Sequence, residues 1–452
     1  MHQYEEQIKR IKEKFGAAKK KDWQRKVFGA DSHRYVINKP LAEKELTSFE
    51  EKYHISLPGS FRAFLLQFGN GGKSYADSAA GPFYGIYPLG ERTDELSSNP
   101  EKYLREPVKI YPGLTADTWN EMIMPFENDD MSDEEFDTAT SEIYAGILPL
   151  GSQGCSYLHG LVLNGPHSGK VVNMDMDRQR PSFTFEATFL DWYERWLDEI
   201  ISGDLILDTP SWFGYTMGGS VTDLLEKYQL AGDETTRQHC LSAMLTKQDI
   251  PDRIIGLLEK EYQPATGGCK KQLLQILTKH HYQLAKPYLV AYCDVDLLAV
   301  FQFIFWYAKD KSIEWLEIIK KNIAHITDGE TFRFCTYLLV ATSADYGDLV
   351  SPMTKNEKED IRATAFYTLG KLSHKARYIS DFISGLDDSS HHVILTALQA
   401  LGGVTDKRLL PAYKKLLERF PTEQDYILSN LGHRLNEMKL TIPELRKQLP
   451  GE

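Results

Sequence analysis

The segment Gly69–Gly72, which reads Gly-Asn-Gly-Gly, is the first candidate for chemistry because glycine-rich loops can hold phosphate. A phosphate loop places its glycines before a helix, where free N–H groups and the positive end of the helix dipole face the anion. Here the apolar residues between Phe61 and Phe68 come first, at helical spacing, and the glycines follow. We therefore predict that these glycines cap the C-terminus of a helix, which presents carbonyl groups, and bind no phosphate.

The segment Gly165–Val171, with the sequence GPHSGKV, is the second candidate because it resembles a Walker loop. Only three residues separate Gly165 from Gly169, whereas the Walker loop has four, and Val171 stands where a Ser or Thr would hold magnesium. The residues on both sides alternate like strands. We predict the turn of a β-hairpin, and no nucleotide site.

Other catalytic and metal-binding signatures are absent from the sequence. It contains no HExxH, GxSxG or GxGxxG motif. The pairs His280-His281 and His391-His392 are adjacent, so on a helix their side chains diverge by about 100° and cannot share a metal as residues i and i+4 would. The acidic run from residue 129 to 137 lacks the Gly and Glu positions of an EF-hand loop. We expect no catalytic residue, no cofactor and no metal.

Cysteine usage and hydropathy favour a reducing, aqueous compartment. The five cysteines, Cys155, Cys240, Cys269, Cys293 and Cys335, lie at least 24 residues apart, which fits neither a disulfide framework nor a zinc ribbon. The first residues alternate charges where a signal peptide needs an apolar core, and no stretch approaches the roughly 20 apolar residues of a spanning helix. We expect a cytoplasmic protein with no membrane partner.

The net charge of −12 is concentrated in the first half of the chain. Residues 1–220 hold 23 Lys and Arg against 34 Asp and Glu, whereas residues 221–452 hold 29 against 30. Between residues 110 and 169 there are ten acids and no Lys or Arg. Because a phosphate backbone binds through Lys and Arg, this window is not expected to contact nucleic acid.

The densest part of this acidic window is our predicted partner-binding surface. A cluster of carboxylates attracts a cationic protein and accelerates its association. The alternative is an acidic loop exposed to solvent with no partner. The predicted partner-binding residues are Glu127, Asp129, Asp130, Asp133, Glu134, Glu135 and Asp137.

The pattern of apolar residues predicts an α+β domain followed by an all-α domain. Residues 1–205 mix helical spacing with strand signals at 84–89, at 147–150 and in a hairpin at 156–175, which indicates an antiparallel sheet packed with helices. The segment after Thr188 predicts a helix with a capping box and an end at Gly203.

Residues 219–452 predict helix after helix. The segments at 363–372 and 395–404 align with a shift of 32 residues, which brings alanine, leucine and glycine into register. Helical hairpins repeated near this length are typical of an α-solenoid, whose units bury apolar faces by stacking on their neighbours.

The sequence from about residue 35 to 203 resembles the SUKH superfamily, which includes yeast regulators of cell-wall synthesis and killer-toxin resistance. The resemblance rests on the order of several short motifs, with a departure in the long acidic insertion between Tyr111 and Ile143. The motif residues, which we expect to be structural, are Leu57, Pro58, Phe61, Asn70, Gly71, Gly72, Gly151 and Tyr157. The C-terminal region resembles HEAT repeats.

The resemblance implies a binding module without catalytic residues. Many bacterial SUKH proteins are immunity proteins that neutralise a toxin, often a nuclease, whereas the eukaryotic relatives are signalling hubs, and HEAT arrays bind proteins. We expect an immunity protein that holds a basic toxin domain. The alternatives are a scaffold in a signalling or envelope-stress pathway, which binds through the solenoid, and a helical-repeat DNA glycosylase, which the near-neutral second half disfavours.

Overall fold

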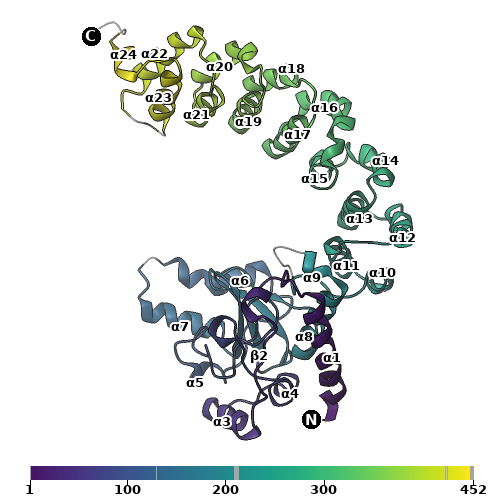
Figure 1. Ribbon diagram of the computed structural model, residues 1–452. Coiled ribbons are helices and arrows are strands. Elements are labelled where there is room, and N and C mark those ends of the chain that lie inside the picture. Colours follow the sequence, from purple (N-terminus) through teal and green to yellow (C-terminus); the bar gives the residue numbers. More distant parts are fainter. Residues whose placement is uncertain (1, 129, 208–212, 423, 425, 448–452) are drawn as a thin grey trace. The chain divides into compact units, whose positions relative to one another are not determined.

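The computed structural model describes residues 2–128, 130–207, 213–422, 424 and 426–447 (Figure 1). Contacts divide the chain into two compact units, Met1–Ile254 (unit 1) and Ile255–Glu452 (unit 2). Unit 1 contains strands and helices, and the described residues of unit 2 are helices and their connections. The predicted fold class, an α+β part followed by an all-α part, is therefore confirmed.

A four-stranded antiparallel sheet forms the centre of unit 1. The strands β1 (Ile147–Gly154), β2 (Tyr157–Val162), β3 (Val171–Asp175) and β4 (Ser182–Phe183) lie side by side in sequence order. Leu161 pairs with Val171 across the turn that joins β2 to β3, so the predicted hairpin is confirmed. Side chains on successive strand residues alternate between the two faces, and both faces are covered.

One face of the sheet carries the larger core, formed with α1 (Glu5–Lys21), α4 (Gly59–Gln67) and α8 (Phe189–Ser202). Trp192, Tyr193 and Trp196 of α8 are fully buried there. The predicted capping box is present: the Thr188 hydroxyl accepts from Asp191 N–H, and the Asp191 carboxylate accepts from Thr188 N–H. The helix ends at Gly203, which has a φ of +97° as a left-handed cap.

The opposite face of the sheet packs against the acidic insertion. This insertion folds into α6 (Ala116–Ile123), the 3-10 turn η3 (Met124–Glu127) and α7 (Asp133–Ile143). Trp119 is buried with Ile143 and Tyr144 against strand residues of β1, β2 and β3. The Trp119 indole N–H also donates to the Arg178 carbonyl at 2.9 Å. A second, smaller core therefore holds the insertion on the sheet.

One predicted strand is wrong. Residues 84–89 run beside β1, where Tyr84 N–H donates to Ser152 O and Tyr87 N–H donates to Leu150 O. The segment otherwise makes only an isolated bridge between Ala79 and Ile86. Gly85, with a φ of +98°, turns the backbone and prevents continuous pairing.

The other elements of unit 1 are short helices around the two cores. They are α2 (Ala30–His33), α3 (Glu43–Tyr53), α5 (Pro100–Tyr103), α9 (Asp204–Leu207), α10 (Val221–Leu230) and α11 (Glu234–Thr246), with the 3-10 turns η1 (His2–Tyr4) and η2 (Tyr75–Asp77). The helices α10 and α11 cluster with the sheet-containing unit. The predicted division into domains 1–205 and 219–452 stays a prediction.

Unit 2 begins within α12 (Asp252–Tyr262) and continues as stacked helices (Figure 1). Helices α13, α15, α17, α19, α21 and α23 form one row, each beside the next, and the helices between them form a second row. The bounds are α13 (Gly267–His280), α14 (Tyr282–Tyr292), α15 (Leu297–Tyr307), η4 (Lys309–Trp315), α16 (Leu316–Asn322), η5 (Ile323–His325), α17 (Gly329–Ala341), α18 (Gly347–Val350), η6 (Ser351–Lys355), α19 (Glu359–Leu369), η7 (Lys375–Tyr378), α20 (Ile379–Leu386), α21 (His391–Ala400), η8 (Lys407–Leu409), α22 (Leu410–Arg419), α23 (Ile427–Glu437) and α24 (Ile442–Arg446).

The two segments that align with a shift of 32 residues form the neighbouring helices α19 and α21. Ala365 and Leu369 of α19 are buried, as are their counterparts Ala397 and Leu401. A Cβ at Gly370 would lie 2.7 Å from Ala400 Cβ, so glycine permits the close approach of the two helices.

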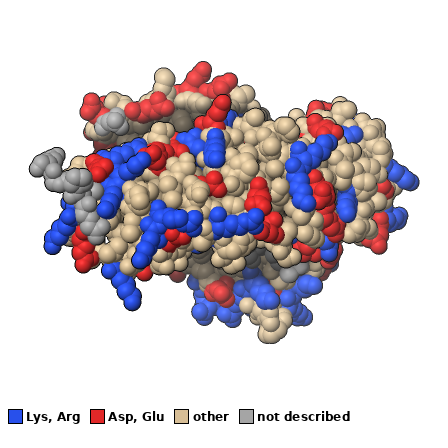
Figure 2. All heavy atoms as spheres, turned by 90° about the horizontal axis from the view of Figure 1, so that it is seen from above, with Lys and Arg blue, Asp and Glu red and all other residues tan. Residues whose placement is uncertain are grey.

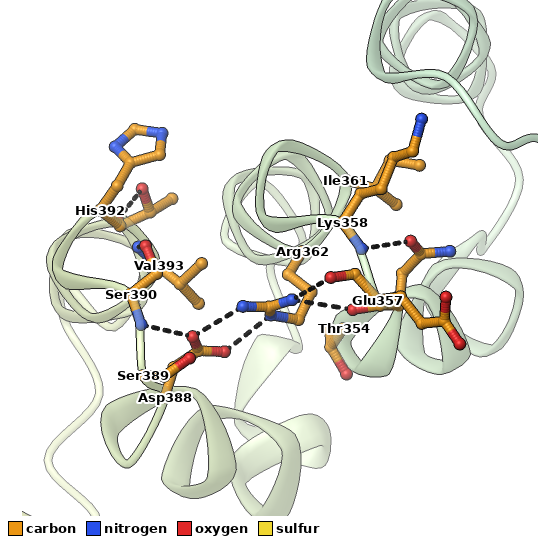
Figure 3. Close-up of polar contacts among 12 residues, drawn as sticks. Thr354, Glu357, Lys358, Ile361, Arg362, Asp388, Ser389, Ser390, His392 and Val393 are labelled. Carbon is orange, nitrogen blue, oxygen red and sulfur yellow. Dashed lines mark hydrogen bonds and ion pairs between the residues drawn. The ribbon is translucent and has the colours of Figure 1, made fainter.

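Arg362 links consecutive helices of unit 2 (Figure 3). Its guanidinium donates to both carboxylate oxygens of Asp388 at 2.8 Å and to the carbonyls of Asn356 and Glu357 at 2.9 Å. Burial alone would raise the pKa of Asp388, but hydrogen bonds from Arg362 and from Ser390 N–H lower it below its ordinary value. This charge-assisted pair fixes the spacing between α19 and the start of α21.

Candidate functional site

The predicted partner-binding acids lie together on the surface of the insertion. Glu127 ends η3 and Asp130 lies in the connection to α7, whereas Asp133, Glu134, Glu135 and Asp137 lie in the first turns of α7. Figure 2 shows Asp and Glu side chains gathered along the upper left edge of that view. All the predicted residues that the structure describes are exposed: Glu127, Asp130, Asp133, Glu134, Glu135 and Asp137. Asp129 lies outside the described residues.

The interpretation of this stretch as an acidic loop is wrong for residues 133–137, which belong to a helix. Ser132 caps α7: its hydroxyl accepts from Glu135 N–H, and the Glu135 carboxylate accepts from the Ser132 N–H at 2.9 Å and hydroxyl at 2.7 Å. These bonds from Ser132 lower the pKa of Glu135 below its ordinary value. The three acids in the first turn also stabilise the helix, because their negative charges lie at the positive end of the helix dipole. Glu135 therefore positions the helix, and the other acids face solvent.

Replacing Ser132 by alanine should destabilise α7 by about 1 kcal/mol, because Glu135 N–H loses its acceptor and the Glu135 carboxylate loses the bond from the Ser132 hydroxyl. The measurement is amide hydrogen exchange of residues 133–143, which should become faster. Ser202→Ala, at the C-terminal end of α8, is the control and should leave exchange in α7 unchanged. Equal protection of α7 in the variant and the native protein would show that the cap does not hold this helix.

Apolar side chains are exposed among the acids. Met124 is 64% exposed and Phe136 of α7 is 39% exposed. The Phe136 and Phe126 rings pack edge to face with centroids 5.2 Å apart. The Arg178 guanidinium lies over both rings, 4.8 Å from the centroid of Phe126 and 5.3 Å from that of Phe136. An apolar centre with a charged rim is the usual composition of a protein interface. Sequence reasoning did not predict these apolar residues or Arg178, because tertiary packing brings them together.

The Gly69–Gly72 segment follows α4, as predicted. Phe68 N–H and Gly69 N–H both donate to Phe64 O, so the segment lies at the carbonyl end of the helix. Asn70 Oδ1 accepts from Leu89 N–H at 2.8 Å, and Gly71 has a φ of +75°. A Cβ at Gly72 would lie 2.5 Å from Val36 O. These residues therefore hold the end of α4 against the neighbouring segments that contain Val36 and Leu89.

The other motif residues also have structural roles. Pro58 precedes α4, where Leu57 and Phe61 are buried, and Leu57 N–H donates to Glu50 Oε1 at 2.8 Å. A Cβ at Gly151 of β1 would lie 2.0 Å from the Gly85 carbonyl, so only glycine fits there. Tyr157 begins β2 and pairs with Gly154 and Asp175.

Two histidines of unit 1 are fully buried. His33 Nδ1 accepts from Tyr35 N–H at 3.1 Å, and its ring lies edge-on to those of Tyr35 and Trp196. His159 Nδ1 lies 3.0 Å from Asn173 Oδ1 and 3.1 Å from Gln153 Nε2. Burial lowers the pKa of each imidazole to about 3. Both rings are therefore neutral parts of the core.

A hollow of about 590 Å³ in unit 1 lies beside the C-terminal half of α8. Its charged groups are largely paired with one another. Arg195 donates to Glu186 and Glu199 at 2.8 and 2.7 Å, and Lys247 contacts Asp204 at 2.8 Å. The hydrogen bonds and charges of Glu199 and Glu186 raise the pKa of Arg195 against the opposing effect of burial. These ion pairs connect α8 to Glu186, which precedes it, and connect α9 to Lys247, which follows α11.

The described residues show no group of three or more His, Cys, Asp or Glu side chains placed to hold a metal ion. Gly165–Val171 forms the turn of the β2–β3 hairpin and the start of β3, as predicted. No helix within the described ranges has both the length and the apolar character that crossing a bilayer requires.

Unit 1 contains the part of the chain that resembles a known protein family. A search of curated proteins gives no match for the chain. Residues 40–195, which include the sheet, the smaller core and the acidic insertion, match the family model of the SMI1 / KNR4 family (SUKH-1). This segment of the chain is therefore similar to the SMI1 / KNR4 family (SUKH-1).

Proposed function

We propose that this protein is a cytoplasmic, non-enzymatic immunity protein that neutralises a cognate toxin by holding it. The single observation that carries the proposal is the exposed acidic surface on η3 and α7, in a segment that matches the SMI1 / KNR4 family (SUKH-1). The motif residues of that segment pack and hydrogen-bond within the fold. The stacked helices of unit 2, which we interpret as HEAT-like repeats, offer a second surface for binding proteins.

The acidic surface suits a nuclease toxin in particular. A nuclease needs a cationic surface to engage nucleic acid, and a carboxylate cluster can occupy that surface in place of the phosphates. Complementary charge also raises the rate of encounter, which matters when a toxin must be captured before it acts. Met124, Phe136 and the Arg178 side chain lie among the acids and provide the desolvated contact that holds the complex after encounter.

The proposal is tested by growth of cells that express the toxin encoded beside this gene. The native protein should restore growth. A variant with Asp130→Asn, Asp133→Asn, Glu134→Gln and Asp137→Asn should protect less at equal expression, because capture becomes about tenfold slower. The matched control changes four other exposed acids of unit 1, with Glu51→Gln, Asp77→Asn, Glu91→Gln and Asp94→Asn, and should protect fully.

Failure of the native protein to protect would reject the immunity function. Equal protection by the acidic-surface variant and the control would leave immunity in place but remove this surface from it.

A scaffold function is the second candidate, and exposed aromatic residues of unit 2 favour it. Trp306 of α15 is 49% exposed and Tyr367 of α19 is 52% exposed, in the same row of helices. Trp306 packs edge to face with Phe334 of α17. Trp306→Ala with Tyr367→Ala should release the partner of a scaffold, whereas an immunity protein with its contact on α7 should retain its toxin in a pull-down.

A further inference from the structure

The turn between α1 and α2 presents a tryptophan to solvent. Trp23 is 75% exposed, although an indole ring is among the side chains most stabilised by burial. Gln24 and Arg25 of the same turn are also exposed. No other aromatic residue occurs between Phe15 and Phe28. The ring is therefore the single exposed aromatic group of this turn.

The base of this turn is rigid because it is tied to the core through Asp22. The Asp22 carboxylate is buried and accepts three hydrogen bonds, from Lys26 N–H at 2.6 Å, from Val27 N–H at 3.2 Å and from the Tyr35 hydroxyl at 2.8 Å. Arg25 N–H donates to Asp22 O at 3.0 Å. Tyr35 in turn stacks on Trp196 of α8. The fold thus holds Trp23 outward.

Five cations surround the apex in the sequence. They are Lys19, Lys20 and Lys21 in the last turn of α1, followed by Arg25 and Lys26, and all five are exposed. Asp22 is the only acid between Glu13 and Asp31, and it is buried. Within the described part of the chain, none of these five side chains forms an ion pair with a carboxylate.

We propose that this Trp23 turn docks the protein on an anionic phospholipid surface. Tryptophan is enriched at the interface between lipid and water, where its ring enters the headgroup region and its N–H stays hydrated. Lysine and arginine beside it meet the phosphates and carboxylates of anionic lipids. One exposed aromatic ring with cations on both sides suits a lipid surface, whereas a single nucleic-acid strand is bound in a groove with several stacking rings.

This peripheral contact differs from our expectation of no membrane partner. That expectation rested on the absence of a spanning segment, which a surface contact does not need. The net acidity of unit 1 lies elsewhere in sequence, chiefly between residues 110 and 169. The docking site is also separate from the proposed toxin surface on α7, so each can fail without the other.

The test is flotation of the full-length protein with vesicles of phosphatidylcholine alone and of phosphatidylcholine with about one third phosphatidylserine. The mixed vesicles should carry the protein at low salt, and the neutral vesicles should not. Lys20→Ala with Arg25→Ala and Lys26→Ala should lower the partition coefficient about 100-fold, since each cation near an anionic surface contributes about fivefold. Trp23→Ala should lower it roughly tenfold.

Lys39→Ala with Lys44→Ala and Lys73→Ala is the matched control, because it removes three exposed cations from the same unit. It should retain most of the binding. No flotation with the mixed vesicles, or equal loss in the two triple variants, overturns the proposal. A third arm offers a single-stranded oligonucleotide: binding of that strand through Trp23 without binding to vesicles also overturns it.

Discussion

Replacing Trp119 by alanine is expected to lower the free energy of unfolding of unit 1 by about 3–5 kcal/mol. Trp119 is buried between α6 and the second face of the sheet, and its N–H bonds to Arg178 O. The substitution leaves a cavity and removes the hydrogen bond of the Arg178 carbonyl. Because α6 leads into η3 and α7, the acidic surface should lose its support as well.

Chemical denaturation measures the loss, and hydrogen exchange in α6 and α7 locates it. Trp23→Ala is the matched control, since the same side chain is removed from an exposed turn and should change stability by less than about 0.5 kcal/mol. Trp119→Phe should recover part of the loss. If Trp119→Ala unfolds like the control, the second core does not hold the insertion in place.

Lowering the pH from 7.5 to 5 is expected to destabilise unit 1 by about 4 kcal/mol through two histidines. The pKa of His33 and of His159 is about 3 in the folded protein, below the ordinary value of 6.5. A depressed pKa means that the unfolded chain binds more protons, so stability is complete above pH 6.5 and falls as the pH drops below it. At pH 5 each imidazole is still neutral in the folded protein but is protonated in the unfolded chain. Each histidine therefore lowers the free energy of unfolding by about 2 kcal/mol.

The measurement is the free energy of unfolding at several pH values between 7.5 and 5. His33→Gln should halve the slope of the free energy of unfolding against pH below pH 6, whatever the substitution does to stability at neutral pH. His54→Asn, which removes an exposed histidine at the left-handed cap of α3, controls for the loss of an imidazole. The carboxylates with lowered pKa values, such as Glu194, lose their contribution only near and below pH 4.5. A flat profile from pH 7.5 to 5 would contradict neutral buried imidazoles.

The elements that sequence reasoning predicted correctly are those that local chemistry specifies. The order of apolar residues and glycines placed Gly69–Gly72 after a helix, because a helix end needs carbonyl capping. Alternation around Gly165–Val171 gave the hairpin, and the capping spacing of Thr188 and Asp191 gave the start of α8. Each signal lies within a few residues along the chain.

The elements that sequence reasoning missed depend on contacts over long sequence separations. Ser132 and Glu135 have capping-box spacing, but the high charge of the stretch obscured α7, whose stability also comes from Ile143 against the sheet. Arg178 follows β3 in the sequence but lies beside the acidic surface in the fold. The acidic segment has no Lys or Arg of its own, yet a guanidinium lies next to it. Trp23 was not singled out because exposure cannot be read from residue type.

The α7 surface is proposed to capture a basic protein through charge. The most direct measurement is the association rate of the purified protein with its toxin, by stopped flow, over a range of ionic strength. The native protein and the Glu51, Asp77, Glu91 and Asp94 control should associate fast at low salt and slow steeply as salt rises. The variant with Asp130, Asp133, Glu134 and Asp137 neutralised should associate about tenfold more slowly and depend less on salt. Equal rates and equal salt dependence in all three proteins would contradict the claim.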